Sequence, residues 1–196
     1  MKEFSIQNAE TVIKEYCLKS NEINPVAMAL ELMKSPMIRL HGPEHHYLTS
    51  AVLAAAYLNA KNLPKDEMLE QLKIRSRKIP PAVCGYYGVC GDVMAAGTFA
   101  SAVLGTTYMS GKEWQDTAKF SLKCLTEVSN SMGPRCCKRT TIAALMAAVD
   151  AIEELFGVKL EKPEKYICTY SRTNEDCIGS NCRYYKKVRV KKASLI

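Results

Sequence analysis

The sequence predicts a mostly α-helical protein, with a compact helical domain around a central helix of small residues and a small, cysteine-rich, irregular C-terminal extension. Three observations support this fold class. Apolar residues recur at helical spacing through the first 160 residues, Pro and Gly bound these segments, and the composition becomes rich in Tyr and Cys after Pro163. We therefore expect a helical domain over residues 1–160 and an extension with a basic tail over residues 161–196, packed on the same domain.

Seven segments carry the helical pattern, and these are residues 6–19, 25–34, 43–59, 64–75, 93–107, 112–128 and 135–156. The second and third begin with a proline, which is favourable in the first turn of a helix. The third is apolar nearly all round, whereas the fourth is more polar and is expected at the surface.

The fifth segment follows a Pro-Pro break and a glycine-rich loop, residues 84–91, that contains two cysteines. Asp92 is placed to help cap this segment. Its side chains are nearly all small or apolar, so we expect it to be central and packed on several sides. For residues 112–128 the expected buried stripe consists of Trp114, Ala118, Leu122 and Leu125. Gly157 is expected to end the last helix as its C-terminal cap.

The net charge of +7 is concentrated at the C-terminus. Six of the 27 basic residues lie in residues 183–196, which contain no acidic residue, so 21 basic and 20 acidic residues remain elsewhere. The N-terminus lacks the apolar run of a signal peptide, and the longest apolar stretch is too short to span a bilayer. We therefore expect a cytoplasmic protein that does not enter a membrane.

Nine cysteines in a reducing compartment suggest metal binding or thiol chemistry more than disulfide bonds. Cys17 and Cys124 lie in amphipathic helical segments and are expected to pack in the core. The other seven are candidate metal ligands, and these are Cys84, Cys90, Cys136, Cys137, Cys168, Cys177 and Cys182. Their C-x5-C and C-x8-C-x4-C spacings match no common zinc motif, and redox-labile surface thiols are the alternative for the three in the extension.

The pair Cys136 and Cys137 stands where the last helix is expected to begin. Unpaired backbone N–H groups, the helix dipole and neighbouring basic residues all favour the thiolate there. The same place suits the carboxylate or phosphate of a small anionic substrate. The candidate substrate-binding residues are Arg135, Lys138, Arg139 and Thr140. The alternative is a capped helix with surface lysine and arginine.

All three histidines fall in the hexapeptide 41–46, at the entrance to the third helical segment. Imidazole titrates near neutral pH and can act as a general base or a ligand. The candidate catalytic residues are His41, His45 and Glu44. The alternative is a polar helix entrance in which His45 or His46 caps the helix.

The tail interleaves aromatic and basic side chains over residues 183–192. This pattern permits binding to RNA or to an acidic partner. A solvated chain end is the more common structure for such a charge run, so a nucleic-acid site is not favoured.

Residues 84–153, which read CGYYGVCGDVMAAGTFASAVLG and then SNSMGPRCCKRTTIAALMAAVDAIEE, resemble the iron–sulfur part of bacterial L-serine dehydratases and L-cysteine desulfidases. The whole chain, including HGPEHHYLTSAVLAAAY and CIGSNCRYY, resembles an uncharacterised cysteine-rich family of anaerobic bacteria and methanogens. Members of that family sometimes accompany methyltransferase-like proteins.

The first resemblance implies a [4Fe-4S] cluster held by three cysteines, with the fourth iron open to a substrate hydroxyl or thiol. By position, Cys84 matches the loop cysteine, and Cys136 or Cys137 matches the cysteine that opens the last helix. The intermediate cysteine of those enzymes falls within residues 129–133 here, where there is none, and their β domain is absent.

These observations lead to three hypotheses. The first is an iron–sulfur protein, with a lyase-like elimination of water or sulfide from a small anionic substrate as its activity. The second is a zinc-binding structural or accessory module that docks a methyltransferase or RNA. The third is a metal-free thiol protein with Cys136 or Cys137 as nucleophile.

Overall fold

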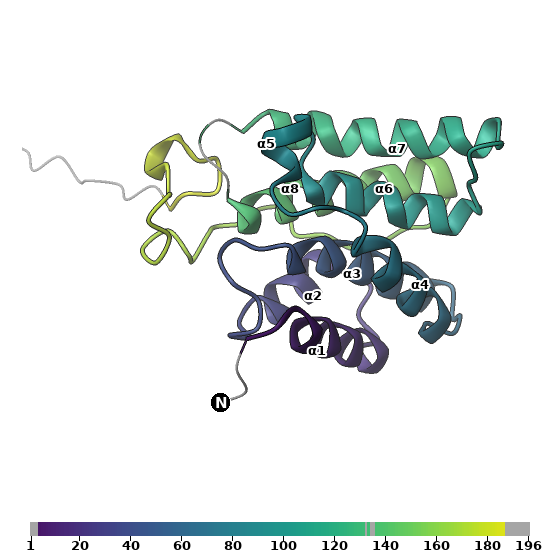
Figure 1. The fold of residues 1–196 in the computed structure, drawn as a ribbon, viewed down its shortest axis with the longest axis horizontal. Coiled ribbons are helices and arrows are strands. Elements are labelled where there is room, and N and C mark those ends of the chain that lie inside the picture. The colour runs from purple at the N-terminus through teal and green to yellow at the C-terminus, as the bar shows by residue number, and fades with distance from the viewer. Residues whose placement is uncertain (1–3, 132, 134–135, 187–196) are drawn as a thin grey trace, which may run out of the picture.

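The computed structural model describes residues 4–131, 133 and 136–186 (Figure 1). The helices, in chain order, are α1 (Ile6–Lys19), α2 (Pro25–Leu32), α3 (Glu44–Ala60), α4 (Asp66–Ser76), α5 (Val83–Tyr87), α6 (Gly91–Leu104), α7 (Lys112–Ser129) and α8 (Cys137–Phe156). A short 3-10 helix, η1, spans Gly179–Asn181. Within the described residues there is no β-strand, so the mostly helical fold class is confirmed.

The helices form two groups that meet at the centre of the molecule. Figure 1 shows α1 to α4 on one side and α5 to α8 on the other. α3 packs against α1, α2, α4, α6 and α8, and every residue from Glu44 to Leu58 is buried. α6, the expected central helix, packs against α3, α4, α7 and α8. The centre of the fold is therefore a pair of small-residue helices, of which α3 is the more buried.

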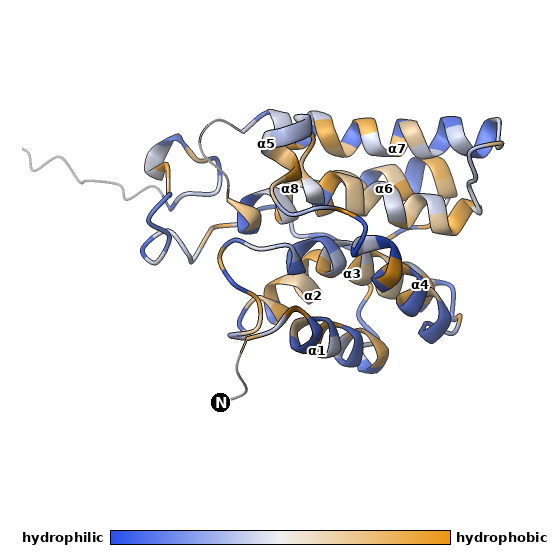
Figure 2. Ribbon diagram, in the orientation of Figure 1, coloured by the Kyte–Doolittle hydropathy of each residue, from blue (hydrophilic) through white to orange (hydrophobic). Residues whose placement is uncertain are grey.

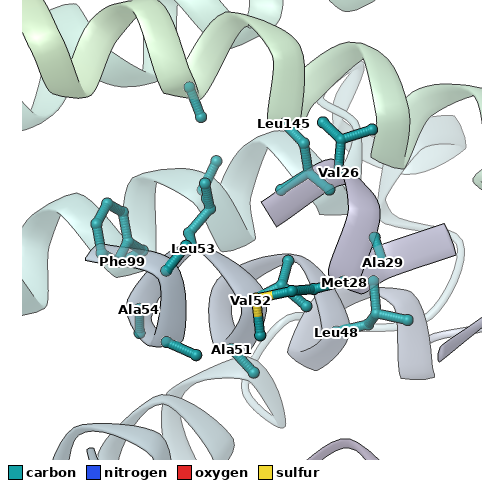
Figure 3. Packing of buried hydrophobic residues seen from close by; sticks show 14 of the residues in the cluster. Val26, Met28, Ala29, Leu48, Ala51, Val52, Leu53, Ala54, Phe99 and Leu145 are labelled. Carbon is teal, nitrogen blue, oxygen red and sulfur yellow. The ribbon is translucent and has the colours of Figure 1, made fainter. Parts of the chain in front are cut away.

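The core is formed by side chains from helices far apart in the sequence. Figure 3 shows Met28 of α2 beside Val52 of α3, and Val26 of α2 beside Leu145 of α8. Phe99 of α6 lies on the side of Leu53. Each of these side chains is fully buried or nearly so. Burial of apolar area on this scale is the main stabilising contribution to the fold.

Local sequence signals set several helix ends. The Ser5 hydroxyl accepts a hydrogen bond from the backbone N–H of Asn8 at 3.1 Å and caps α1. The Asn24 side chain caps α2 in the same way through Ala27, at 3.0 Å. At the other end of the domain, Gly157 follows α8 with φ of +66°, the left-handed conformation expected of a C-terminal glycine cap.

Three local expectations were wrong. Residues 83–87 form the short helix α5 rather than a loop. Asp92 makes no capping hydrogen bond, because its carboxylate accepts from side chains of other helices. Trp114 and Leu122 of the expected α7 stripe are 58% and 61% exposed, whereas Phe120 and Cys124 are buried.

The buried side of α7 differs from the expected stripe because α7 packs against both α6 and α8. Figure 2 shows hydrophilic and hydrophobic residues alternating along α7. Cys17 and Cys124 are both fully buried, which confirms that they pack in the core.

The extension packs on the helical domain. Tyr184 belongs to the main core, and the Cys168 backbone N–H donates to the Tyr184 carbonyl at 2.7 Å. A Cβ added at Gly133 would lie 2.4 Å from Ile178 Cγ2, so the segment before α8 lies directly against the extension. None of the helices in the described part of the chain is long and apolar enough to cross a membrane.

Candidate functional site

Cys136, the residue that precedes α8, borders two cavities. The first, which we name the extension cavity, has a volume of about 20 Å3. Its cysteines are Cys136, Cys168, Cys177 and Cys182. The second, the bundle cavity, has a volume of about 840 Å3. Its cysteines are Cys84, Cys90, Cys136 and Cys137. The seven candidate ligands thus divide between two cavities that share one thiol.

Hydrogen bonds are directed at the sulfurs of the extension cavity. The backbone N–H of Tyr170 donates to Cys168 Sγ at 3.3 Å, and that of Gly179 donates to Cys177 Sγ at 3.4 Å. Both donors lie two residues after the cysteine that accepts the bond. Hydrogen bonds to the ligand atoms are a usual feature of the surroundings of metal sites in proteins.

A buried amine also borders the extension cavity. Lys138 is 2% exposed, and its Nζ donates to the Ile38 carbonyl at 2.9 Å and lies 5.0 Å from the centre of the Tyr170 ring. Burial lowers the pKa of Lys138 to about 8, against the opposing effects of Glu44 and the neighbouring cysteines. A protonated Lys138 places a positive charge beside the thiols.

The expected preference of Cys136 for the thiolate is not found. Burial raises the pKa of the Cys136 thiol, and its neighbours Cys168 and Cys182 add to the rise, whereas Arg139 opposes it. Desolvation therefore outweighs the position at the start of α8. Cys136 also accepts a hydrogen bond from Asn174 Nδ2 at 3.4 Å.

The thiols of the extension cavity do not form a ready-made metal site. Within residues 4–131, 133 and 136–186, no three His, Cys, Asp or Glu side chains meet closely enough to hold a metal ion. A metal would have to draw the four sulfurs together. Three of the four lie in the extension, whose only described regular element is η1, so small backbone adjustments there can move them.

The bundle cavity contains a buried carboxylate with three donors. Asp92 is 2% exposed, and its oxygens accept from Thr49 Oγ1 at 3.1 Å and Thr140 Oγ1 at 2.7 Å. The Cys90 thiol donates to the same carboxylate at 3.7 Å. Burial, followed by the charge of Asp92, raises the pKa of Cys90 to about 12, so this cysteine is a neutral donor here. Cys84, by contrast, is exposed.

The two ring nitrogens of His45 connect α8 to the segment that precedes α3. Nε2 lies 2.9 Å from the Arg39 carbonyl and Nδ1 lies 2.9 Å from Thr141 Oγ1. Because a carbonyl only accepts, Nε2 carries the proton and Nδ1 accepts from the hydroxyl. The ring is fully buried, and burial lowers its pKa.

The other two expected catalytic residues are also bound to neighbours. Glu44 is fully buried and accepts from Arg39 Nε at 3.0 Å and Nη2 at 2.8 Å. Burial raises the pKa of Glu44, but the hydrogen bonds from Arg39 outweigh it and hold the pKa below its usual value. His41 Nε2 lies 3.1 Å from Asn174 Oδ1 and 3.6 Å from Asp176, and so connects the α3 entrance to the extension.

The histidine not chosen from the sequence is the one that lines the bundle cavity. His46 is 9% exposed, and its Nδ1 is buried with no hydrogen-bond partner in the described part of the chain. The histidine cluster was the available signal, but helical spacing alone does not show which ring faces a cavity.

Of the expected anion-binding residues, Arg139 borders both cavities and Thr140 borders the bundle cavity, whereas Arg135 lies outside the described residues.

Comparison with known proteins supports the broader of the two resemblances. A family model described as "Family of unknown function (DUF5714)" matches residues 13–185, a range that includes all nine cysteines and all three histidines. No curated protein and no solved structure matches the chain, so the comparisons do not support the likeness to L-serine dehydratases. The chain belongs to the DUF5714 family, whose function is unknown.

Proposed function

We propose that this protein is a metalloprotein in which Cys136, Cys168, Cys177 and Cys182 hold a thiolate-ligated metal centre. The observation that carries the proposal is that these four cysteines line one small cavity, although they come from the start of α8 and from three places in the extension. Such a centre would join the extension to the helical domain.

The electrostatics of the metal-free thiols support the proposal. Cys168 and Cys182 each raise the pKa of Cys136, because neighbouring thiolates repel one another. A bound cation reverses this effect and deprotonates the ligands. The N–H donors at Cys168 and Cys177 would then stabilise the charged sulfurs.

The size of the extension cavity favours one metal ion. A volume of about 20 Å3 has room for little more than one water molecule. Four thiolates around a single ion match the all-cysteine ligand set of many structural zinc sites. The iron–sulfur cluster expected from the sequence is the alternative, and the larger bundle cavity, with Cys84, Cys90, Cys136 and Cys137, is where it would fit.

Metal analysis of the full chain purified without oxygen tests the proposal. We expect about one metal ion per chain, with about four more thiols protected from alkylation than after the metal is removed, as in zinc sites whose ligands are all cysteines. Cys168→Ser and Cys177→Ser should lose the metal, whereas Cys84→Ser should keep it.

Two results would contradict the proposed ligand set. One is wild-type protein that binds neither zinc nor iron after anaerobic reconstitution. The other is that Cys84→Ser loses the metal and Cys168→Ser keeps it. If the wild-type protein then also contains iron and acid-labile sulfide and absorbs broadly in the visible range, these results would assign a cluster to the bundle cavity. In that case the elimination reaction should be assayed as pyruvate formed from L-serine and sulfide released from L-cysteine.

A further inference from the structure

Three of the four cysteines that line the extension cavity accept a hydrogen bond at their sulfur. Backbone N–H groups donate to Cys168 Sγ at 3.3 Å and to Cys177 Sγ at 3.4 Å. The Asn174 side chain donates through Nδ2 to Cys136 Sγ at 3.4 Å. In the part of the chain that the structure describes, no donor is directed at the sulfur of Cys182. The fourth sulfur therefore differs from the other three.

The turn that follows Cys182 explains this difference. The Tyr185 backbone N–H donates to the Cys182 carbonyl at 3.0 Å, so the turn closes on the carbonyl oxygen. After Cys168 and after Cys177, by contrast, the backbone N–H two residues later donates to the sulfur. The backbone of the extension thus directs its donors to two sulfurs and leaves the third without one.

Cys182 also lies close to solvent. The residue is partly exposed, and its neighbours Asn181 and Arg183 are exposed. The Arg183 guanidinium forms an ion pair with Glu127 of α7, so its charge is already balanced there. A reagent in solution can therefore approach the cavity from the side of Cys182.

Metal binding would give the difference between the sulfurs a chemical consequence. A bound metal ion deprotonates all of its thiol ligands, so the four sulfurs would no longer differ in their thiolate fraction. A hydrogen bond holds part of the electron density of a thiolate and makes it a weaker nucleophile. The thiolate that accepts no such bond then reacts first with an electrophile.

We propose that Cys182 is the modification site of the metal centre and takes an alkyl group from a soft carbon electrophile. This inference rests on the proposed centre of four cysteines. The Cys182 thiolate attacks the electrophilic carbon and a sulfur–carbon bond forms. The bond from that carbon to its leaving group breaks, and the leaving group departs with the electron pair. No proton moves and the metal keeps its oxidation state.

The product would be a neutral thioether in place of a charged ligand. Structural zinc sites are held by thiolate sulfur, so the loss of one thiolate weakens the hold on the ion. Alkylation of Cys182 would therefore release the metal and loosen the connection between the extension and the helical domain. The centre would in this way respond to electrophiles.

Timed alkylation of the zinc-loaded full chain tests the proposal. Iodoacetamide supplies the electrophilic carbon, iodide is the leaving group, and peptide mapping by mass spectrometry follows each cysteine separately. A Cys84→Ser background removes the exposed thiol. We expect Cys182 to react about three- to tenfold faster than the other three ligands, as expected for one hydrogen bond to a charged sulfur, with zinc released in step. Equal or faster reaction at another ligand would overturn the assignment.

A variant that lacks one donor gives a second readout. Asn174→Asp removes the donor to Cys136 but keeps Oδ1, which accepts from the Asp176 backbone N–H at 3.1 Å. Alkylation of Cys136 should become about three- to tenfold faster, while the rate at Cys182 stays the same.

Ser171→Ala is the matched control for this variant. Ser171 lines the same cavity, and in the described structure its hydroxyl donates to no sulfur, so both rates should stay within about twofold. An unchanged rate at Cys136 in Asn174→Asp would refute the role of the hydrogen bond. If this variant loses its zinc, the order of reaction without it decides.

The metal content, measured before the reagent is added, separates this inference from the proposed function. A chain that binds no metal through these cysteines overturns both. A chain that binds zinc through all four but reacts first at a ligand other than Cys182 overturns only the reactivity assigned here.

Discussion

At the residue scale, the start of α3 is held by buried polar side chains whose partners come from other segments. Glu44 accepts two hydrogen bonds from the Arg39 guanidinium and a third from the Arg39 backbone N–H at 3.0 Å. His45 is bound to the Arg39 carbonyl and to Thr141 of α8. These residues fix the segment that carries His46 to the bundle cavity, so Glu44 and His45 position this segment.

The lowered pKa of Glu44 predicts how the stability of the protein changes with pH. Its pKa in the folded protein is held below the usual 4.5, so the unfolded chain takes up its proton more readily. The stabilising contribution is therefore present above pH 4.5 and is lost as the pH falls through the folded-state value. Glu44→Gln should lower the free energy of unfolding by about 1–3 kcal/mol at pH 7 and flatten its decline in acid.

Urea denaturation at several pH values measures both effects. Glu31→Gln is the control, because Glu31 is half exposed in its ion pair with Lys34 and should change stability by less than about 0.5 kcal/mol. If the free energy of unfolding of Glu44→Gln falls in acid as steeply as that of wild type, other carboxylates cause the decline.

At the scale of elements, α8 connects the two cavities to the core. It begins beside Cys136, packs against α2, α3, α6 and α7, and ends at Gly157. Its first turn supplies Lys138, Arg139 and Thr140 to the cavities, whereas its later residues supply apolar contacts. The orientation of the site residues thus depends on where this helix starts and how it packs.

The C-terminal cap of α8 gives a second prediction. Gly157 has φ of +66°, a conformation that costs any residue with a Cβ atom about 1 kcal/mol. Gly157→Ala should lower the free energy of unfolding by that amount in thermal or urea denaturation. Gly85→Ala, at a helical glycine with no atom near the added Cβ, should be neutral or slightly stabilising. Equal effects of the two substitutions would contradict the argument.

At the scale of the whole molecule, the extension and the helical bundle share one core. Tyr184 is buried in the main cluster, Arg183 forms an ion pair with Glu127 of α7, and the Glu161 backbone N–H donates to the Ile23 carbonyl at 3.2 Å. Contacts of this extent join two parts of a chain into one cooperative unit.

We therefore expect a single unfolding transition. Far-UV circular dichroism follows the helices, and near-UV signals follow the packing of all aromatic side chains, including the four tyrosines of the extension. The two melting curves should coincide in wild type. Gly133→Ala should lower the near-UV midpoint first, because an added Cβ would lie 2.4 Å from Ile178 and φ is +101°. Separate transitions in wild type would show that the extension unfolds as a unit of its own.

Much of the helical architecture follows from the sequence because its signals are local. Ser5, Asn24 and Gly157 act on N–H or carbonyl groups within a few residues, so the helices that they bound are predictable. The buried stripe of α7 was not predictable, because Phe120 and Cys124 also follow helical spacing. Only the neighbouring helices decide that Phe120 is buried and Trp114 is exposed.

The sequence by itself determined that the protein is helical and that two cysteines belong to the core, and it singled out the remaining cysteines and the histidines as candidate site residues. Only the tertiary structure decided which of them meet. Cys136 reaches the extension cysteines across more than thirty residues of chain, and His46 of α3 reaches the start of α6 across forty-five. Contacts at such separations depend on how α3, α6 and α8 pack, and no local spacing encodes that packing.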